Sequence, residues 1–220
     1  MRILVTAVVA SACGVADAQT SIRYDITLAV RSNTIAATDP GTTFASVPAG
    51  SPGMLSIEAS TTPFADFGDA NTLSYPVLSA TASVGGIDLM LDQSGYPSPT
   101  FLNGLGVSND VSSPFFGPNA DLMTSIVSSL LADVAFVGFS VGGPGDGTLA
   151  PGLWDSVQLP SAIDLGLPGV KGLFSIDGPK RINSDGQLLA DITAIEITLV
   201  PAPGSAALLT AGLLLARRRR

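Results

Sequence analysis

Histidine is absent from this sequence of 220 residues, and Cys13 is its only cysteine. Without an imidazole, the chain lacks the base of a Ser-His-Asp triad and the base of a Cys-His dyad. Zinc sites built from histidine and cysteine are excluded for the same reason. Most of the familiar catalytic machinery is therefore missing, and we expect a protein that is not an enzyme.

Positive charge is also scarce. Residues 19–200 carry five Lys or Arg side chains against seventeen Asp or Glu side chains, a net charge of −12. No basic residue lies between Arg31 and Lys171, whereas twelve acidic residues do. A negative field of this kind repels phosphate backbones and anionic lipids, so no nucleic-acid partner is expected.

Apolar residues make up 46% of the chain, which places it far from the polar compositions that stay unfolded. The stretch between the two chain ends is long enough to bury one core without disulfide bonds. It contains no repeat of fixed period and no linker long enough to divide it. We therefore expect one folded domain over residues 19–199.

The first eighteen residues have the layout of a secretory signal peptide. Arg2 precedes an apolar stretch over residues 3–10, and the small residues Ala16 and Ala18 mark the cleavage site. We predict export through the general secretory translocon and cleavage after Ala18. This cleavage removes Cys13 and leaves no thiol for a disulfide. A lipoprotein signal that is acylated at Cys13 is the alternative.

Residues 200–220 form a segment with three parts: a proline motif, an apolar run to residue 216, and a basic tail. As a helix, residues 202–216 would span ~22 Å, which is less than the ~30 Å of a bilayer core. The basic tail would stay on the cytoplasmic side of the membrane. The motif and the tail consist of Val200, Pro201, Ala202, Pro203, Gly204, Arg217, Arg218, Arg219 and Arg220.

This layout resembles the PEP-CTERM sorting signal, in which a Val-Pro-Glu-Pro-like motif precedes a short apolar helix and a basic tail. Val200, Pro201 and Pro203 match the motif, whereas Ala202 stands in place of the family's glutamate. The resemblance implies that a membrane-embedded cysteine protease, an exosortase, recognises and cuts the segment. It implies nothing about the activity of the rest of the chain.

Apolar and polar residues alternate along residues 22–31, the pattern of a strand with one buried face. Similar stretches recur, separated by clusters of turn-forming residues. The stretches lie at residues 55–59, 77–84, 87–91, 134–141 and 195–199, and the turn clusters at 48–53, 85–86, 142–147 and 183–186. We predict a single all-β domain, an antiparallel β-sandwich of jelly-roll type, with a barrel as the alternative.

One short helix is expected over residues 120–132. Asn119 can cap it, and Leu122, Ile126 and Leu130 recur at fourfold spacing. The serines and threonines in this stretch are mediocre helix formers. The segment is the one predicted exception to the all-β pattern.

Residues 138–142 match the G-x-S-x-G pattern of a hydrolase nucleophile, with Ser140 at the centre. That chemistry needs a base to accept the serine proton, and the sequence has no histidine to supply one. We therefore interpret these residues as a buried strand that contains glycine and enters a loop.

Oxygen ligands for a cation cluster at Asp66, Asp69 and Asn71, in an expected loop. Such ligands suit Ca²⁺, and a solvated acidic loop is the plainer interpretation. Residues 183–186 also resemble part of a calcium loop, but Arg181 stands at the first ligand position. We expect a hairpin turn there instead.

Glycoside hydrolysis needs only two carboxylic acids. The two glutamates, Glu58 and Glu196, lie on the polar faces of expected strands, where simple exposure explains them. Sugar binding without hydrolysis needs exposed aromatic rings. Tyr96 is the best candidate for such a ring, since Trp154 is expected in the core.

The sequence thus predicts a non-enzymatic protein that is exported and held transiently in the membrane by its C-terminal helix. It is then displayed at the cell surface or in the extracellular matrix, where envelope polysaccharide is the expected contact. A lectin-like or Ca²⁺-assisted glycan-binding module is the first alternative. A glycosidase that works with carboxylates alone is the second.

Overall fold

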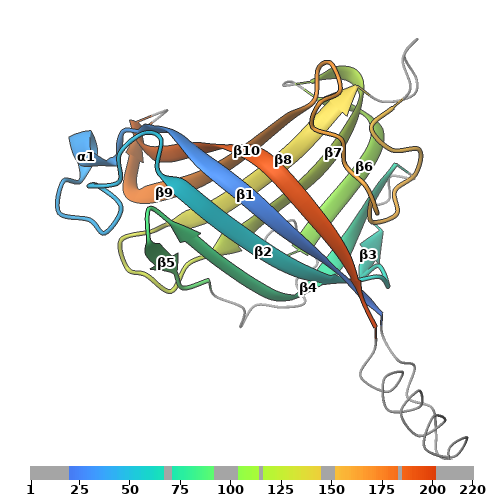
Figure 1. Cartoon of the computed structure of the whole chain (residues 1–220), viewed down its shortest axis with the longest axis horizontal. Coiled ribbons are helices and arrows are strands. Elements are labelled where there is room, and N and C mark those ends of the chain that lie inside the picture. Colours follow the sequence, from blue (N-terminus) through green and yellow to red (C-terminus); the bar gives the residue numbers. More distant parts are fainter. Residues whose placement is uncertain are drawn as a thin grey trace, which may run out of the picture. The chain divides into compact units, whose positions relative to one another are not determined.

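The computed structural model describes residues 20–66, 71–91, 104–113, 116–144, 152–182 and 185–201. Thr20–Val200 form one compact unit. In the described residues this unit contains ten strands and one helix of four residues (Figure 1). The strands are β1 (Ser21–Asn33), β2 (Pro52–Ser60), β3 (Ala65–Asp66), β4 (Thr72–Val84), β5 (Ile87–Leu89), β6 (Gly104–Ser113), β7 (Gly117–Ser128), β8 (Phe136–Pro144), β9 (Lys171–Ile182) and β10 (Asp185–Val200), and the helix is α1 (Ile35–Thr38).

All ten strands belong to one antiparallel sheet, in the order β2-β1-β10-β9-β8-β7-β6-β4-β3, with β5 paired to β4. Because β2 also pairs with β4, the sheet closes into a barrel. The predicted all-β, antiparallel fold is confirmed. The predicted two-sheet sandwich is not what the strands form. They form the barrel that the sequence left as the alternative, and closure removes the exposed edges that a sandwich would keep.

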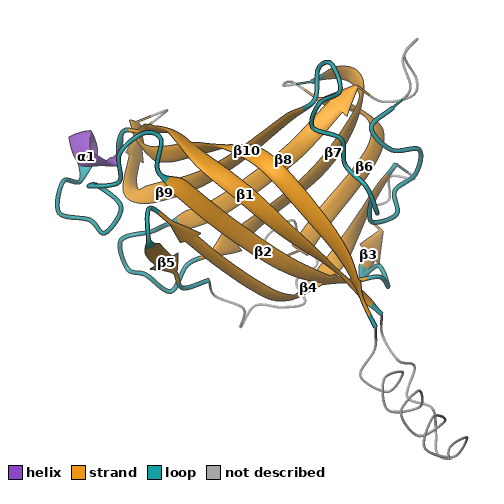
Figure 2. Cartoon of the chain, in the orientation of Figure 1, coloured by secondary structure: helices purple, strands orange, loops and turns teal. Residues whose placement is uncertain are grey.

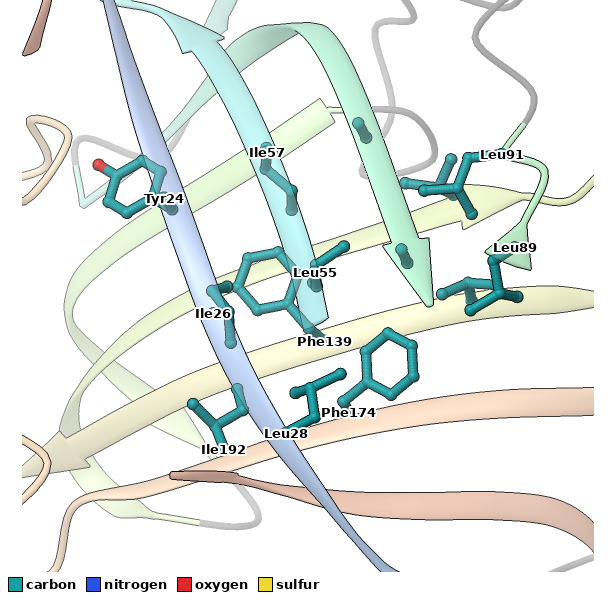
Figure 3. Packing of buried hydrophobic residues seen from close by; sticks show 14 of the residues in the cluster. Tyr24, Ile26, Leu28, Leu55, Ile57, Leu89, Leu91, Phe139, Phe174 and Ile192 are labelled. Atoms are coloured by element: carbon teal, nitrogen blue, oxygen red, sulfur yellow. The ribbon is translucent and has the colours of Figure 1, made fainter. Parts of the chain in front are cut away.

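The inward faces of the strands fill the barrel. Along β1, apolar side chains at every second position are at most 9% exposed, and the residues between them face outward or lie partly exposed. The alternation predicted for residues 22–31 is therefore confirmed. Figure 3 shows these side chains meeting others from strands across the barrel, including Phe139 of β8 and Phe174 of β9. Burying one such side chain contributes about 1.5–3 kcal/mol.

The predicted helix over residues 120–132 is wrong, because residues 117–128 form strand β7. Nine consecutive residues of β7 pair with β8. The inward side chains of β7 include the polar Asp121 and Ser125, and the apolar Leu122 and Ile126 lie on the outward face. The contrast between a polar and an apolar face of β7 is therefore weak. Leu122 and Ile126 are four residues apart, which is also the spacing of apolar residues on one face of a helix.

The predicted turn at residues 85–86 is confirmed. Gly85 and Gly86 join β4 to β5 in a two-residue hairpin, with φ of 61° and 80°. Two positive φ angles in such a turn favour glycine strongly. The predicted turn at residues 183–186 lies partly outside the described residues. On either side of the part that is not described, Ile182 of β9 pairs with Asp185 of β10.

One end of the barrel is covered by residues 34–47, here called the cap segment. It follows β1 directly and contains α1, the purple helix in Figure 2. Phe44 and Val47 are buried in the core. Asn33, at the end of β1, donates from Nδ2 to the carbonyl oxygens of Phe44 and Val47, at 2.8 Å each. The cap segment is therefore held in part by the strand that precedes it, and in part by Gln187 of β10 and by Asp133.

The barrel end away from α1 is covered by residues 153–160, here called the plug segment (Figure 1). Trp154 and Leu159 are each 9% exposed and belong to the core. The Trp154 indole N–H donates to the carbonyl oxygen of Ser108 on β6 at 2.9 Å. Trp154 thus anchors the core, as the sequence predicts.

Two tyrosines inside the barrel also hold the plug segment. The Tyr24 hydroxyl on β1 donates to the carbonyl oxygen of Pro160 at 2.9 Å, and the Tyr75 hydroxyl on β4 donates to that of Val157 at 2.8 Å. Burial raises the pKa of Tyr24 well above its usual value, and the repulsion that an ionised Tyr24 would meet from an ionised Tyr75 adds to this effect. Burial also raises the pKa of Tyr75. Both hydroxyls therefore stay protonated, as donors must.

Candidate functional site

The folded unit begins and ends on neighbouring strands. Ser21, at the start of β1, pairs with Val200, at the end of β10, and Pro201 beyond it is exposed. Among the described residues, no helix is long and apolar enough to cross a membrane. The remaining predicted cleavage and sorting residues lie outside the described part of the chain: Ala16, Ala18, Ala202, Pro203, Gly204, Arg217, Arg218, Arg219 and Arg220.

The predicted calcium ligands are only partly described. Asp66 pairs with Leu73 in the β3–β4 ladder. Asn71 is exposed just before β4, and its backbone carbonyl accepts the N–H of Asn109 at 2.9 Å. Asp69 lies outside the described residues. In the part of the chain that the structure describes, no three acidic or cysteine side chains gather to hold a metal, so the calcium site stays a prediction.

The residues considered for hydrolytic chemistry, Ser140 and the two glutamates, lie on strands. Ser140 is in the middle of β8, opposite Thr124 and Leu173, so residues 138–142 form the predicted strand and not a nucleophile turn. Glu58 on β2 is half-buried and accepts a hydrogen bond from the Ser21 hydroxyl at 2.5 Å. Glu196 is exposed on β10, and β1 separates these two strands. Tyr96 lies outside the described residues.

A cavity of about 450 Å³ lies on the outer face of four neighbouring strands, β8, β9, β10 and β1. Ser140, Leu173 and Asp191 are aligned across three of these strands. They lie on the outward face, because the side chains next to them along each strand are buried in the core. These buried neighbours are Val141, Phe174 and Ala190.

Irregular pairing between β1 and β10 shapes this cavity. The register shifts twice, and at the second shift, between Val30 and Ser32, Arg31 has no residue opposite it. A β-bulge of this kind bends its strand and redirects a side chain. Arg31 approaches Asp191, with Nη1 at 3.1 Å from Oδ1. The bulge therefore places a guanidinium group at the cavity.

An aromatic ring forms one wall of the cavity. Phe116 lies over Gly142 of β8, where a Cβ atom would come within 2.7 Å of Phe116 Cε2 and 2.8 Å of the Asp121 carbonyl oxygen. A larger residue than glycine would push the ring away. The wall therefore exists because position 142 has no side chain.

The cavity carries more positive than negative charge. Arg31 and Lys171 bring two cations, and Asp191 is the acidic residue in the lining. The Arg31 and Asp191 side chains are 51% and 50% exposed, so their ion pair adds little to stability. Lys171 is exposed, and neither ion pair among the described residues involves it. This local charge contrasts with the net charge of −12 on residues 19–200.

A smaller cavity of about 290 Å³ is lined by residues of the plug segment and by the two residues after it. Its polar lining includes Asp155, Ser156, Gln158 and Ser161. Each of these two cavities has one acidic residue in its lining. Neither one therefore holds the pair of carboxyl groups that glycoside hydrolysis requires.

A buried carboxylate joins the plug segment to the barrel. Asp121 is 0% exposed, and its Oδ2 accepts the backbone N–H of Trp154 at 3.0 Å. Its Oδ1 accepts the backbone N–H of Asp110 at 3.2 Å and the side-chain amide of Asn109 at 3.0 Å. Burial raises the pKa of Asp121, although the backbone hydrogen bonds act in the opposite direction. Because both oxygens are occupied within the protein, Asp121 has a structural role.

Sequence reasoning alone does not find the cavity. Arg31 and Lys171 stand out in the sequence as the ends of a long stretch without cations. Only the strand order β1-β10-β9 brings the two together. The charge pattern therefore indicates two unusual residues, but only the strand order shows that they lie at one site.

Comparisons with known proteins do not assign a family. A scan against protein-family models, a search of curated proteins and a search of solved structures each gave no match.

Proposed function

We propose that the protein is an exported, non-catalytic module of the cell surface or the extracellular matrix. The secretory translocon would carry it out, and an exosortase-like membrane protease would process its C-terminal segment. The barrel would remain as a structural or interaction module in contact with envelope polysaccharide. The layout of the two chain ends and the lack of histidine support this proposal.

The pairing of Ser21 with Val200 carries the proposal furthest. Cleavage after Ala18 would fall before the first residue of β1, and cleavage beyond Val200 would fall after the last residue of β10. Neither cut would remove a strand or a hydrogen bond of the sheet. The folded unit can therefore lose both terminal segments and keep its core, which suits a protein that is processed at both ends.

A glycan-binding module is the second candidate function, with or without Ca²⁺. The cavity on the outer face of β8, β9, β10 and β1 favours it, because this cavity opens outward. A glycan array with and without a chelator tests this candidate. Binding that the chelator abolishes would support a Ca²⁺-assisted module, and uniform silence would rule out this second function.

The export proposal is tested by cell fractionation and by protease treatment of intact cells. We expect the wild-type barrel in the envelope or the medium, accessible to added protease. Replacing all four terminal arginines with glutamine should leave the protein unprocessed in the membrane fraction. Arg23→Gln, which removes one charge from the barrel surface, is the control and should behave as wild type. Wild-type protein that stays in the cytosol would refute the proposal.

A further inference from the structure

The cavity bounded by Arg31 and Lys171 is the place where the acidic barrel can accept an anion. In residues 32–170 there is no cation, and the two cations that flank this stretch line the same cavity. Arg31 is already oriented by Asp191 at 3.1 Å. Lys171 enters neither ion pair in the described part of the chain, so its ammonium group remains available to a ligand.

The rest of the lining fits a ligand with a ring-sized body. Phe116 and Leu173 supply apolar surface, and Ser140 supplies a hydroxyl group on the same face. The volume of about 450 Å³ lies within the roughly 300–1,000 Å³ of small-molecule sites. A few polar groups set in apolar surface are typical of sites that fix the orientation of a ligand.

We propose that this cavity binds a carboxylate carried on a ring-sized body, with Lys171 and Arg31 on the carboxylate and Phe116 against the ring. A guanidinium group can hold a carboxylate through two parallel N–H bonds. The carboxylate could belong to a uronic acid unit of an acidic polysaccharide or to a free organic acid. The first source rests on the proposed function, and the second does not.

The test is isothermal titration of the full chain in mild detergent at low ionic strength. The probes are trigalacturonate, the neutral galactose trimer and phenylacetate. We expect binding of trigalacturonate and no binding of the neutral trimer. Raising the salt concentration should weaken binding, because exposed charges are screened beyond about 10 Å at 0.1 M salt. Binding of phenylacetate alone would support the carboxylate site and assign it to a free acid.

Matched variants locate the bound carboxylate. Lys171→Gln should weaken binding by about three- to tenfold, as expected for the loss of one charge-assisted contact. Arg23→Gln removes the same charge elsewhere on the barrel and should leave binding unchanged. Circular dichroism should show both variants folded, since both side chains are exposed. Phe116→Ala should weaken binding of either acid by removing the ring contact.

The proposal is overturned if no acidic probe binds, if the neutral trimer binds equally well, or if Lys171→Gln and Arg23→Gln have the same effect. None of these results would affect the export proposal, because the export proposal is tested by the location of the protein and by the processing of its two ends.

Discussion

The cap segment and the plug segment close the two ends of one barrel, but different parts of the chain hold them. The cap segment has a local partner in Asn33, which lies 11 and 14 residues from the carbonyl groups it binds. It also has two distant partners, Asp133 and Gln187, at 90 and 153 residues along the chain. The plug segment is hydrogen-bonded by side chains 33 to 136 residues away, those of Asp121 and Tyr24 among them. Long-range contacts cost more chain entropy than local ones. Part of the anchoring of the cap segment can therefore form with β1, whereas the side chains that hold the plug segment come from distant strands.

The two ends also use carboxylates in opposite ways. At the plug end, burial raises the pKa of Asp121. At the cap end, Oδ2 of Asp133 accepts the backbone N–H of Thr43 at 2.6 Å, and hydrogen bonds from Thr43 lower the pKa of Asp133. A change of pH should therefore affect the two ends with opposite sign.

The largest effect is expected from Trp154→Ala, which should lower the free energy of unfolding by about 3–5 kcal/mol. The substitution removes a buried ring and its hydrogen bond to Ser108. Because Trp154 is the only tryptophan, urea unfolding is followed by circular dichroism. Limited proteolysis should then cut within residues 153–160 and spare residues 34–47. Equal cleavage of both segments would show that the two ends are not independent.

Asp121→Asn should cost about 1–2 kcal/mol at neutral pH, because the new amide places N–H groups against N–H donors. The raised pKa of Asp121 means that its carboxyl group favours folding below its unfolded pKa of 3.8, and that this stability is lost as pH rises through the folded pKa. In urea unfolding measured from pH 3 to 7, the free energy of unfolding of the variant should therefore not show this decrease with rising pH.

Asp133→Asn is the matched variant at the cap end. The lowered pKa of Asp133 contributes stability above its unfolded pKa of 3.8, and this stability is lost as pH falls. The free energy of unfolding of the variant should therefore not show this decrease as the pH falls. If both variants change the pH dependence in the same direction, the contrast between the two carboxylates does not hold.

The smallest effect is expected from Tyr24→Phe, about 1 kcal/mol below pH 9, for the loss of the hydrogen bond to Pro160. Since burial raises the pKa of Tyr24, the wild type loses stability as pH rises above 10, where tyrosine in the unfolded chain ionises. The difference between wild type and variant should therefore shrink above pH 10. A difference that stays constant to pH 11 would contradict the role given to this hydroxyl.

The sequence predicted a strand best where one face is buried and the other is polar. β1 meets this condition, and its alternation is clear. β7 does not, because Asp121 and Ser125 point inward and Ile126 points outward. The sequence pattern does not predict β6 or β9. In β6, two glycines and several polar residues blur the alternation.

The closure of the sheet could not be predicted, because it depends on register across the whole chain. The pairing of β2 with β4 is not marked by any local motif. The bulge at Arg31 is invisible for the same reason. The scarcity of basic residues marks Arg31 and Lys171 as unusual in the sequence. Only the folded barrel shows that both line the same cavity.

The intact mass of the mature protein, recovered from the envelope or the medium of growing cells, tests the central claim most directly. Export with processing at both ends predicts a chain that starts at Gln19 and ends between Val200 and Ala216, with the barrel complete. A single cytosolic species that still carries Met1 and Arg220 would contradict it.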